Sequence, residues 1–200
     1  MKSFFPVLAG LLLTACVGNV QMAEVAQYDL GNLAAKESNS RLPITEVDVQ
    51  AASWLSGQAM YFRLAYADSL RRQSYAESRW AAPPAELLEG FLKRRIVFGQ
   101  TGSGGAGCRL ELVIDEMEQR FDDPRTSHVV LAVRAQMAPR RTTEMLARRV
   151  FLIQKPAALP VARGGVAAAR EAVQALADEL GGWMNELAQD TPAIIERCRA

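Results

Sequence analysis

Histidine and cysteine are scarce in this 200-residue sequence, and neither sign of charge is in clear excess. It has one histidine and three cysteines, and its formal net charge is +1 at pH 7. This balance gives no reason to expect a nucleic acid as partner. Neither Cys108 nor Cys198 has another cysteine or histidine at ligand spacing, so the sequence predicts neither a metal site nor another cofactor.

No group of residues suggests catalysis either. His128 lies in a predicted strand, and no serine or cysteine beside it has the context of a nucleophile. Asp122 and Asp123 are adjacent carboxylates, but Pro124 follows them, which favours a solvated turn. We therefore expect a protein that is not an enzyme. Four arginine pairs are scattered along the chain and are expected on solvated faces: Arg71-Arg72, Arg94-Arg95, Arg140-Arg141 and Arg148-Arg149.

Long hydrophobic runs are also scarce. No apolar stretch reaches the length of about 18 residues that a spanning helix needs. The run from Phe4 to Leu13 follows Lys2 and is shorter, so it predicts a signal peptide. It ends in Leu13-Thr14-Ala15-Cys16, which has the pattern of a bacterial lipobox. The small residues give a signal peptidase access, and the thiol is the side chain that can accept a diacylglyceryl group.

The lipobox predicts cleavage between Ala15 and Cys16, with covalent diacylglyceryl and N-acyl lipid on Cys16. The three acyl chains of these groups together make an effectively permanent membrane anchor. The alternative is a plain secretory signal in which the cysteine is coincidental.

We expect a signal peptide over 1–15, a flexible tether over 16–24 and one periplasmic domain over 25–200. Val17 stands where an aspartate would favour inner-membrane retention, so we expect a lipid-anchored protein of the bacterial envelope, in the outer membrane and facing the periplasm.

Two cysteines remain once Cys16 carries lipid. In an oxidising periplasm an even number favours a disulfide, here between Cys108 and Cys198. Such a bond would attach the C-terminal tail to the sheet. The alternative is two buried free thiols.

Alternating apolar and polar residues predict most of the strands. Order is expected to begin near 25–31, and 34–41 is expected to form a loop. The predicted strands are Ile44–Val49, Met60–Tyr66, Gln73–Ser78, Cys108 to as far as Phe121, Val129–Met137 and Met145–Lys155. The second and third of these are spaced as a hairpin, and Pro156 and Pro160 are expected to end the sheet.

Two helices are predicted from apolar residues at helical spacing. One runs from Ala85 to about Phe98, directly after Pro83 and Pro84, and the other from about Gly165 to Leu187. Between them, Gly102, Gly104 and Gly107 match a dinucleotide-binding pattern formally. That pattern needs a strand before it and a helix after it, and here the order is reversed, so a surface loop is favoured.

These elements predict an α+β fold in which two main helices pack on a mostly antiparallel sheet. The order is ββββ-α-βββ-α, a two-layer α/β sandwich. The last three strands are joined by short connections and should be antiparallel neighbours. How the strands of the two halves pair cannot be read from the pattern.

With its lipobox, the run from Trp54 to Leu64 and the block Tyr75-Ala76-Glu77-Ser78-Arg79-Trp80-Ala81-Ala82-Pro83-Pro84, the chain resembles the ABC-type transport auxiliary lipoproteins of the paraquat-inducible protein C type. The resemblance covers nearly all of the chain after Cys16. It implies a lipid-anchored, non-enzymatic subunit of an envelope lipid-transport system. The implied partners are a mammalian-cell-entry-domain protein and an ABC permease and ATPase. A homo-oligomer is compatible with such a subunit, although nothing in the periodicity requires one.

The stretch from Trp54 to Trp80 is the predicted partner-binding surface, because aromatic and arginine side chains dominate interface energetics. The candidate residues are Trp54, Tyr61, Arg63, Tyr75, Arg79 and Trp80. The competing interpretation is that most of these rings belong to the core. Two other functions stay open: a lipoprotein that assembles or pilots another outer-membrane complex, and, with least support, an envelope hydrolase.

Overall fold

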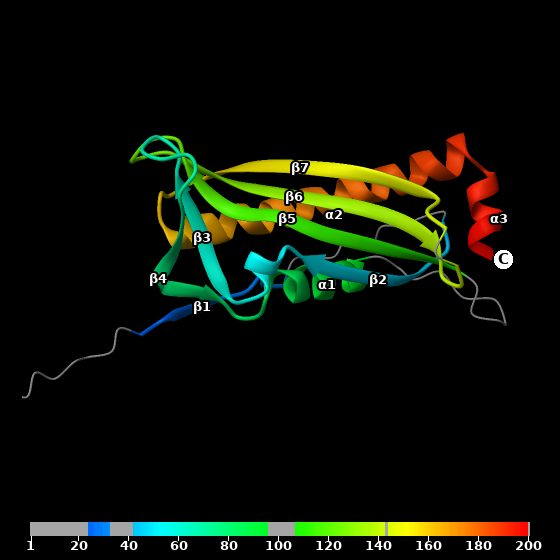
Figure 1. Cartoon of the computed structure of the whole chain (residues 1–200), viewed down its shortest axis with the longest axis horizontal. Coiled ribbons are helices and arrows are strands. Elements are labelled where there is room, and N and C mark those ends of the chain that lie inside the picture. Colours follow the sequence, from blue (N-terminus) through cyan, green and yellow to red (C-terminus); the bar gives the residue numbers. More distant parts are fainter. Residues whose placement is uncertain (1–23, 33–41, 96–106, 143, 200) are drawn as a thin grey trace, which may run out of the picture.

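A computed structural model describes residues 24–32, 42–95, 107–142 and 144–199. Figure 1 shows a long curved sheet with helices behind it. The strands are β1 (Ala26–Tyr28), β2 (Ile44–Ala51), β3 (Ala59–Leu64), β4 (Arg72–Trp80), β5 (Cys108–Phe121), β6 (Ser127–Pro139) and β7 (Ala147–Ala157). The helices are the short 3₁₀ turn η1 (Ser53–Leu55) and the α-helices α1 (Pro84–Arg95), α2 (Ala162–Asp190) and α3 (Ala193–Arg199). The predicted fold class and element order are confirmed, with α3 added at the end.

The sheet is mixed, and its longest pairings are antiparallel, in line with the predicted mostly antiparallel sheet. Its order is β1-β4-β3-β5-β6-β7, and β2 pairs with β5 outside this path. The hairpin β3–β4 and the meander β5–β6–β7 are antiparallel, as predicted. The pairs β1–β4, β2–β5 and β3–β5 are parallel. Parallel pairing requires a long connection, and α1 with the segments around it supplies the one that leads into β5.

One edge of β5 is shared by two strands. β2 pairs with its first half, from Ile44 opposite Cys108 to Ala51 opposite Ile114. β3 pairs with its last residues, from Phe62 opposite Gln119 onward. The chain therefore runs along β5 as one interrupted strand, and η1 occupies the interruption. This placement puts Trp54 of η1 beside the middle of the sheet.

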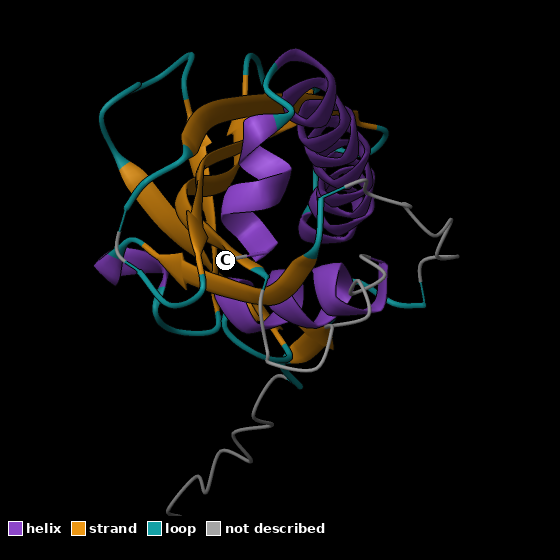
Figure 2. Cartoon of the chain, turned by 90° about the vertical axis from the view of Figure 1, so that its right-hand side faces the viewer, coloured by secondary structure: helices purple, strands orange, loops and turns teal. Residues whose placement is uncertain are grey.

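All three α-helices lie on one face of the sheet (Figure 2). α2 packs against β6 and β7, and α1 packs against β2. The apolar positions that predicted α2 are confirmed as its buried stripe, including Val173, Leu176, Leu180 and Met184. They meet the helix-facing side chains of the sheet, such as Leu112, Leu131 and Phe151, in one core. The opposite face, called the open face below, carries no α-helix of the described part of the chain. Among the described residues no helix has the length and apolar character needed to cross a membrane.

The predicted disulfide is present. Cys108 at the start of β5 is bonded to Cys198 of α3, and the two Cα atoms lie 4.9 Å apart. Both cysteines are buried, so the bond fixes α3 to the helix-facing side of the sheet. α3 was not predicted because its seven residues follow Pro192 and are too few to show a helical period.

Element boundaries differ from the prediction in two informative places. Pro156 does not end β7, which continues to Ala157. β7 is the last strand of the sheet, and an edge strand tolerates a residue without an amide hydrogen. The helix α1 begins at Pro84, one residue before its predicted start. The predicted signal peptide 1–15, tether residues 16–23 with Cys16, and the loop residues 34–41 and 102–106 lie outside the described residues.

Candidate functional site: an arginine and tryptophan cluster on the open face

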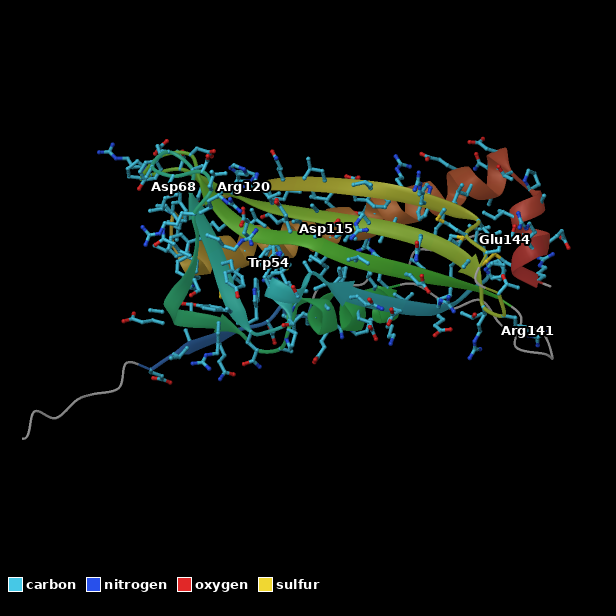
Figure 3. All side chains as sticks on the ribbon, in the orientation of Figure 1. Trp54, Asp68, Asp115, Arg120, Arg141 and Glu144 are labelled. Carbon is cyan, nitrogen blue, oxygen red and sulfur yellow. A yellow bond between two sulfur atoms is a disulfide. The ribbon has the colours of Figure 1, made fainter. Side chains whose placement is uncertain are left out.

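Four charged side chains and one indole converge on the open face. Glu118 and Arg120 come from β5, Arg63 from β3, Arg72 from β4 and Trp54 from η1. Figure 3 shows Trp54 and Arg120 on the side of the sheet that faces the viewer. These five residues are called the Glu118 cluster below.

Glu118 is the centre of the cluster and is 2% exposed. Arg63 donates to both of its carboxylate oxygens, from Nε to Oε1 at 2.9 Å and from Nη2 to Oε2 at 3.2 Å. Arg120 Nε donates to Oε1 at 2.8 Å, and Arg72 Nε donates to Oε2 at 3.1 Å. Each oxygen thus accepts two charge-assisted hydrogen bonds, which is the arrangement that a buried carboxylate needs.

The arginines keep Glu118 ionised. Burial by itself would raise the pKa of Glu118, but the hydrogen bonds from Arg63, Arg120 and Arg72 outweigh burial and hold the pKa below its ordinary value. The same hydrogen bond from Arg63 to Glu118 raises the pKa of the Arg63 guanidinium. Glu118 is therefore ionised throughout the neutral pH range. The Glu118 cluster as a whole contains three guanidinium groups and one carboxylate.

Two of the arginines have further partners. Arg63 Nη1 donates to the carbonyl oxygen of Ser69 at 2.7 Å, which ties the β3–β4 loop to the cluster. Arg120 also pairs with Glu116, on the same strand. These contacts hold the guanidinium planes in place, so the cluster is preorganised rather than mobile.

Trp54 covers one side of the cluster. The guanidinium carbon of Arg72 lies 3.4 Å from the centroid of the Trp54 ring, a stacked cation–π contact. The ring of Tyr61 meets Trp54 edge-on, with centroids 5.2 Å apart. An arginine between an indole and a buried carboxylate is largely desolvated while its edge still reaches the surface. Such a patch can bind a partner or an anionic group by stacking and hydrogen bonding.

A β-bulge decides which face Glu118 occupies. The pairing of β5 with β6 shifts between Ile114 and Glu116. Before this shift the even-numbered residues of β5 face the helices, as Leu112 does, and after it the odd-numbered residues do. Gln119 accordingly points towards α2, where a Cβ added at Gly165 would lie 2.1 Å from its Oε1 atom. Glu118 therefore points to the open face.

The helix-facing side of the same strands carries a neutral polar chain. Tyr75 of β4 donates its hydroxyl hydrogen to Gln119 Oε1 at 2.9 Å, and Gln119 Nε2 donates to Ser127 Oγ at 2.8 Å. Burial raises the pKa of Tyr75 to about 12, so the phenol stays protonated and can donate. This chain of hydrogen bonds satisfies the buried polar atoms of Tyr75, Gln119 and Ser127.

The structure separates the six predicted partner-binding residues into four groups. Trp54, Tyr61 and Arg63 lie together on the open face, in or beside the Glu118 cluster. Tyr75 lies on the opposite side of the sheet. Trp80 is 5% exposed and belongs to the core, as the competing interpretation held. Arg79 is exposed on β4 opposite Gln27 of β1, away from the cluster.

Sequence reasoning missed Glu118 and Arg120 and placed Arg72 on a solvated face. Alternation alone could not find Glu118, because the bulge reverses the faces of β5 after Ile114. The sequence did offer one indication of a polar face here, because a charged residue stands at every second position: Glu116, Glu118 and Arg120. A second arginine expected in solvent, Arg95 of α1, is 3% exposed and pairs with Asp178 of α2.

The other titratable residues considered in the sequence have structural partners. His128 Nδ1 lies 2.8 Å from Asp122 Oδ2. Asp123 accepts hydrogen bonds from Thr126 and from the amide of Arg125, and the contact with Thr126 is the main cause of its lowered pKa. Both aspartates thus serve the β5–β6 turn, as predicted. Within the described ranges, no three histidine, cysteine, aspartate or glutamate side chains form a metal-binding group.

No protein-family model and no curated protein matches the chain. Solved structures do match. Protein XCC0632 from Xanthomonas campestris, described as a member of the family model DUF330, superposes with a TM-score of 0.64 at 17% identity, covering 86% of this chain and 97% of that one. A crystal structure described as an uncharacterized protein gives a TM-score of 0.60 at 11% identity, covering 80% and 99%. Lipoprotein GNA1162 from Neisseria meningitidis gives only 0.28 at 12% identity, covering 70% and 96%, which is too low to carry an argument. At these identities, the first two matches establish a shared fold over most of the chain.

Proposed function

We propose that this chain is a lipid-anchored, non-enzymatic auxiliary subunit of an ABC-transporter and mammalian-cell-entry type system that moves lipids in the bacterial envelope. In this role it contacts partner proteins in the periplasm. The lipobox at Leu13–Cys16 and the family resemblance support the anchor and the system. The single structural observation that supports a contact role is the Glu118 cluster, which presents a stacked arginine and indole on the open face.

The chemistry of the cluster suits protein binding. Arginine and tryptophan are enriched at the centres of interfaces, where desolvation and stacking concentrate the binding energy. Glu118 fixes Arg63, Arg72 and Arg120 before any partner arrives, which lowers the entropy lost on binding. The cluster has excess positive charge, so its partner surface should offer carboxylates or backbone carbonyls.

The test is an affinity pull-down of the full-length, lipidated protein from solubilised envelopes, followed by mass spectrometry. We expect recovery of a mammalian-cell-entry-domain protein together with a permease and an ATPase. Recovery of a different outer-membrane assembly would favour the alternative of an assembly or pilot lipoprotein. The Trp54→Leu and Arg72→Gln variants should each reduce the recovery of these partners about tenfold. A tenfold change corresponds to a loss of about 1.4 kcal/mol of binding free energy. Arg94→Gln, which removes an exposed arginine of α1, is the matched control and should bind like the wild type.

The proposed anchor has its own test. Cys16→Ser should abolish incorporation of radiolabelled palmitate and leave the protein in the soluble periplasmic fraction. Density-gradient separation of the envelopes would then show whether the wild-type protein resides in the outer membrane. Labelling that persists in Cys16→Ser would contradict lipidation at this cysteine.

A further inference from the structure

Strand β7 is a long edge strand. In the described part of the chain it pairs with β6 alone, in continuous register from Ser127 opposite Ala157 to Met137 opposite Ala147. Figure 1 shows it along the upper border of the sheet. An edge strand presents a row of backbone donors and acceptors that another strand can pair with, and proteins normally blunt such edges with charges, prolines or bulges.

The middle of β7 is not blunted in this way. Five uncharged residues, Val150–Gln154, separate Arg148 and Arg149 at one end from Lys155 and Pro156 at the other. Val150 is 69% exposed and Leu152 is 62% exposed. Both lie on the open face, opposite Arg134 and Ala132 of β6. A central segment of high β-propensity with exposed aliphatic side chains is suited to accept an added strand.

The charges at the two ends of β7 are all positive. The strand carries Arg148, Arg149 and Lys155 and no acidic residue. Arg149 pairs with Glu186 of α2 at 2.8 Å. Arg148 and Lys155 form no ion pair within the described residues. An added strand would therefore find uncompensated positive charge at both ends and an apolar centre.

A hollow of about 480 Å³ continues this surface across the open face. Its open-face lining includes Glu111, Val113, Arg134, Gln136, Arg148 and Val150. Arg134 is paired with Asp115 through two hydrogen bonds, at 2.6 and 2.8 Å. Arg148 thus remains the cation that could receive a carboxylate there.

We propose that the edge of β7 binds an extended acidic segment of a partner protein as an additional β-strand of the sheet. Alternate apolar side chains of that segment would lie beside Val150 and Leu152, and its carboxylates would meet Arg148 and Lys155. A second copy of this chain suits the edge poorly. Antiparallel self-pairing centred on Leu152 would set Arg149 opposite Lys155, and like charges facing each other across a strand pair are destabilising.

The experiment is a selection from a library of random twelve-residue peptides on phage, with the full-length lipidated protein in detergent as the target. We expect enriched peptides in which β-branched residues alternate with aspartate or glutamate. A synthetic copy of the most enriched peptide should bind with an affinity that falls at least tenfold in Leu152→Glu. Amides of β7 should become protected from hydrogen exchange when this peptide binds.

Leu70→Glu is the matched control, because Leu70 is 88% exposed in the β3–β4 loop and far from β7 in sequence. It should leave the affinity unchanged. The proposal is overturned if no acidic peptide is enriched, if binding does not depend on Leu152, or if light scattering shows a dimer of the chain that Leu152→Glu dissociates.

Discussion

Glu118 is the residue on which the order of the open-face cluster depends. Replacing it with glutamine leaves three guanidinium groups without their common anion. We expect Glu118→Gln to lower the free energy of unfolding by about 3 kcal/mol at pH 7, as is typical when one member of a buried ion pair is removed. Urea unfolding followed by tryptophan fluorescence would measure the difference. Glu116→Gln is the matched control, because Glu116 is more exposed and its one ion pair among the described residues is with Arg120. Its loss should cost less than about 1 kcal/mol.

The pKa shift of Glu118 adds a pH dependence. Its folded-state pKa is lower than its unfolded value, so its stabilisation is present above the unfolded pKa, near 4.5, and is lost as the pH falls through the folded pKa. The stability difference between the wild type and Glu118→Gln should therefore be constant from pH 6 to 7 and narrow steadily below about pH 4.5. A difference that widens on acidification would contradict the ionised state of Glu118.

Tyr75 makes a separate prediction on the helix-facing side. The sequence contains four tyrosines. With a pKa of about 12, Tyr75 should ionise after a tyrosine of ordinary pKa, near 10. A titration followed by ultraviolet absorbance should show this late step, and the step should be absent in Tyr75→Phe. The wild type should also lose stability above pH 10, because the unfolded phenol ionises first. A late step that survives in Tyr75→Phe would assign it to another tyrosine.

At the scale of elements, α2 offers two glycines with opposite surroundings. A Cβ at Gly165 would lie 2.1 Å from Gln119 Oε1, so Gly165→Ala must push the start of α2 away from β5 or displace Gln119. We expect a loss of about 1 to 3 kcal/mol. A Cβ at Gly182 meets nothing within 4 Å. Gly182→Ala should stabilise the protein by about 0.5 to 1 kcal/mol, since alanine favours a helix over glycine. Thermal unfolding of both variants tests the pair, and equal shifts would contradict close packing at Gly165.

The elements were largely predictable because their periods are strong. Alternating apolar and polar residues predicted the long strands β5 and β6, and apolar residues three to four positions apart predicted α1 and α2. Strand order between the halves was not predictable, because β2 and β3 both pair with β5 and neither periodicity nor connection length encodes that sharing. The site depended on the bulge near Asp115, where one extra residue moves Glu118 to the other face. Trp54 and Arg63 could be selected by residue type, but the same criterion selected Trp80, which is buried.

At the scale of the whole molecule, the disulfide joins the first residue of the long strand β5 to the last helix, α3. Cys108 and Cys198 are 90 residues apart in sequence, and closing a loop of this length is worth about 4 to 5 kcal/mol in the chain-entropy account. We expect Cys198→Ser to lower the free energy of unfolding by about 4 kcal/mol. Adding dithiothreitol to the wild type should have a similar effect and should leave Cys198→Ser unchanged. A reductant effect of equal size in the variant would contradict this origin.

The short strand β1 sets how the molecule would respond to a mechanical load. The described chain begins at Glu24, and β1 attaches it to the sheet through three residues that pair in parallel with β4. Beyond β1, Arg170 of α2 donates to the carbonyl oxygen of Leu30 at 2.9 Å. If the N-terminal side is held at a membrane while the open face is pulled by a partner, tension enters through this narrow junction. β1 would then detach from β4 before the long meander β5–β6–β7 separates, and the rest of the sheet would stay folded.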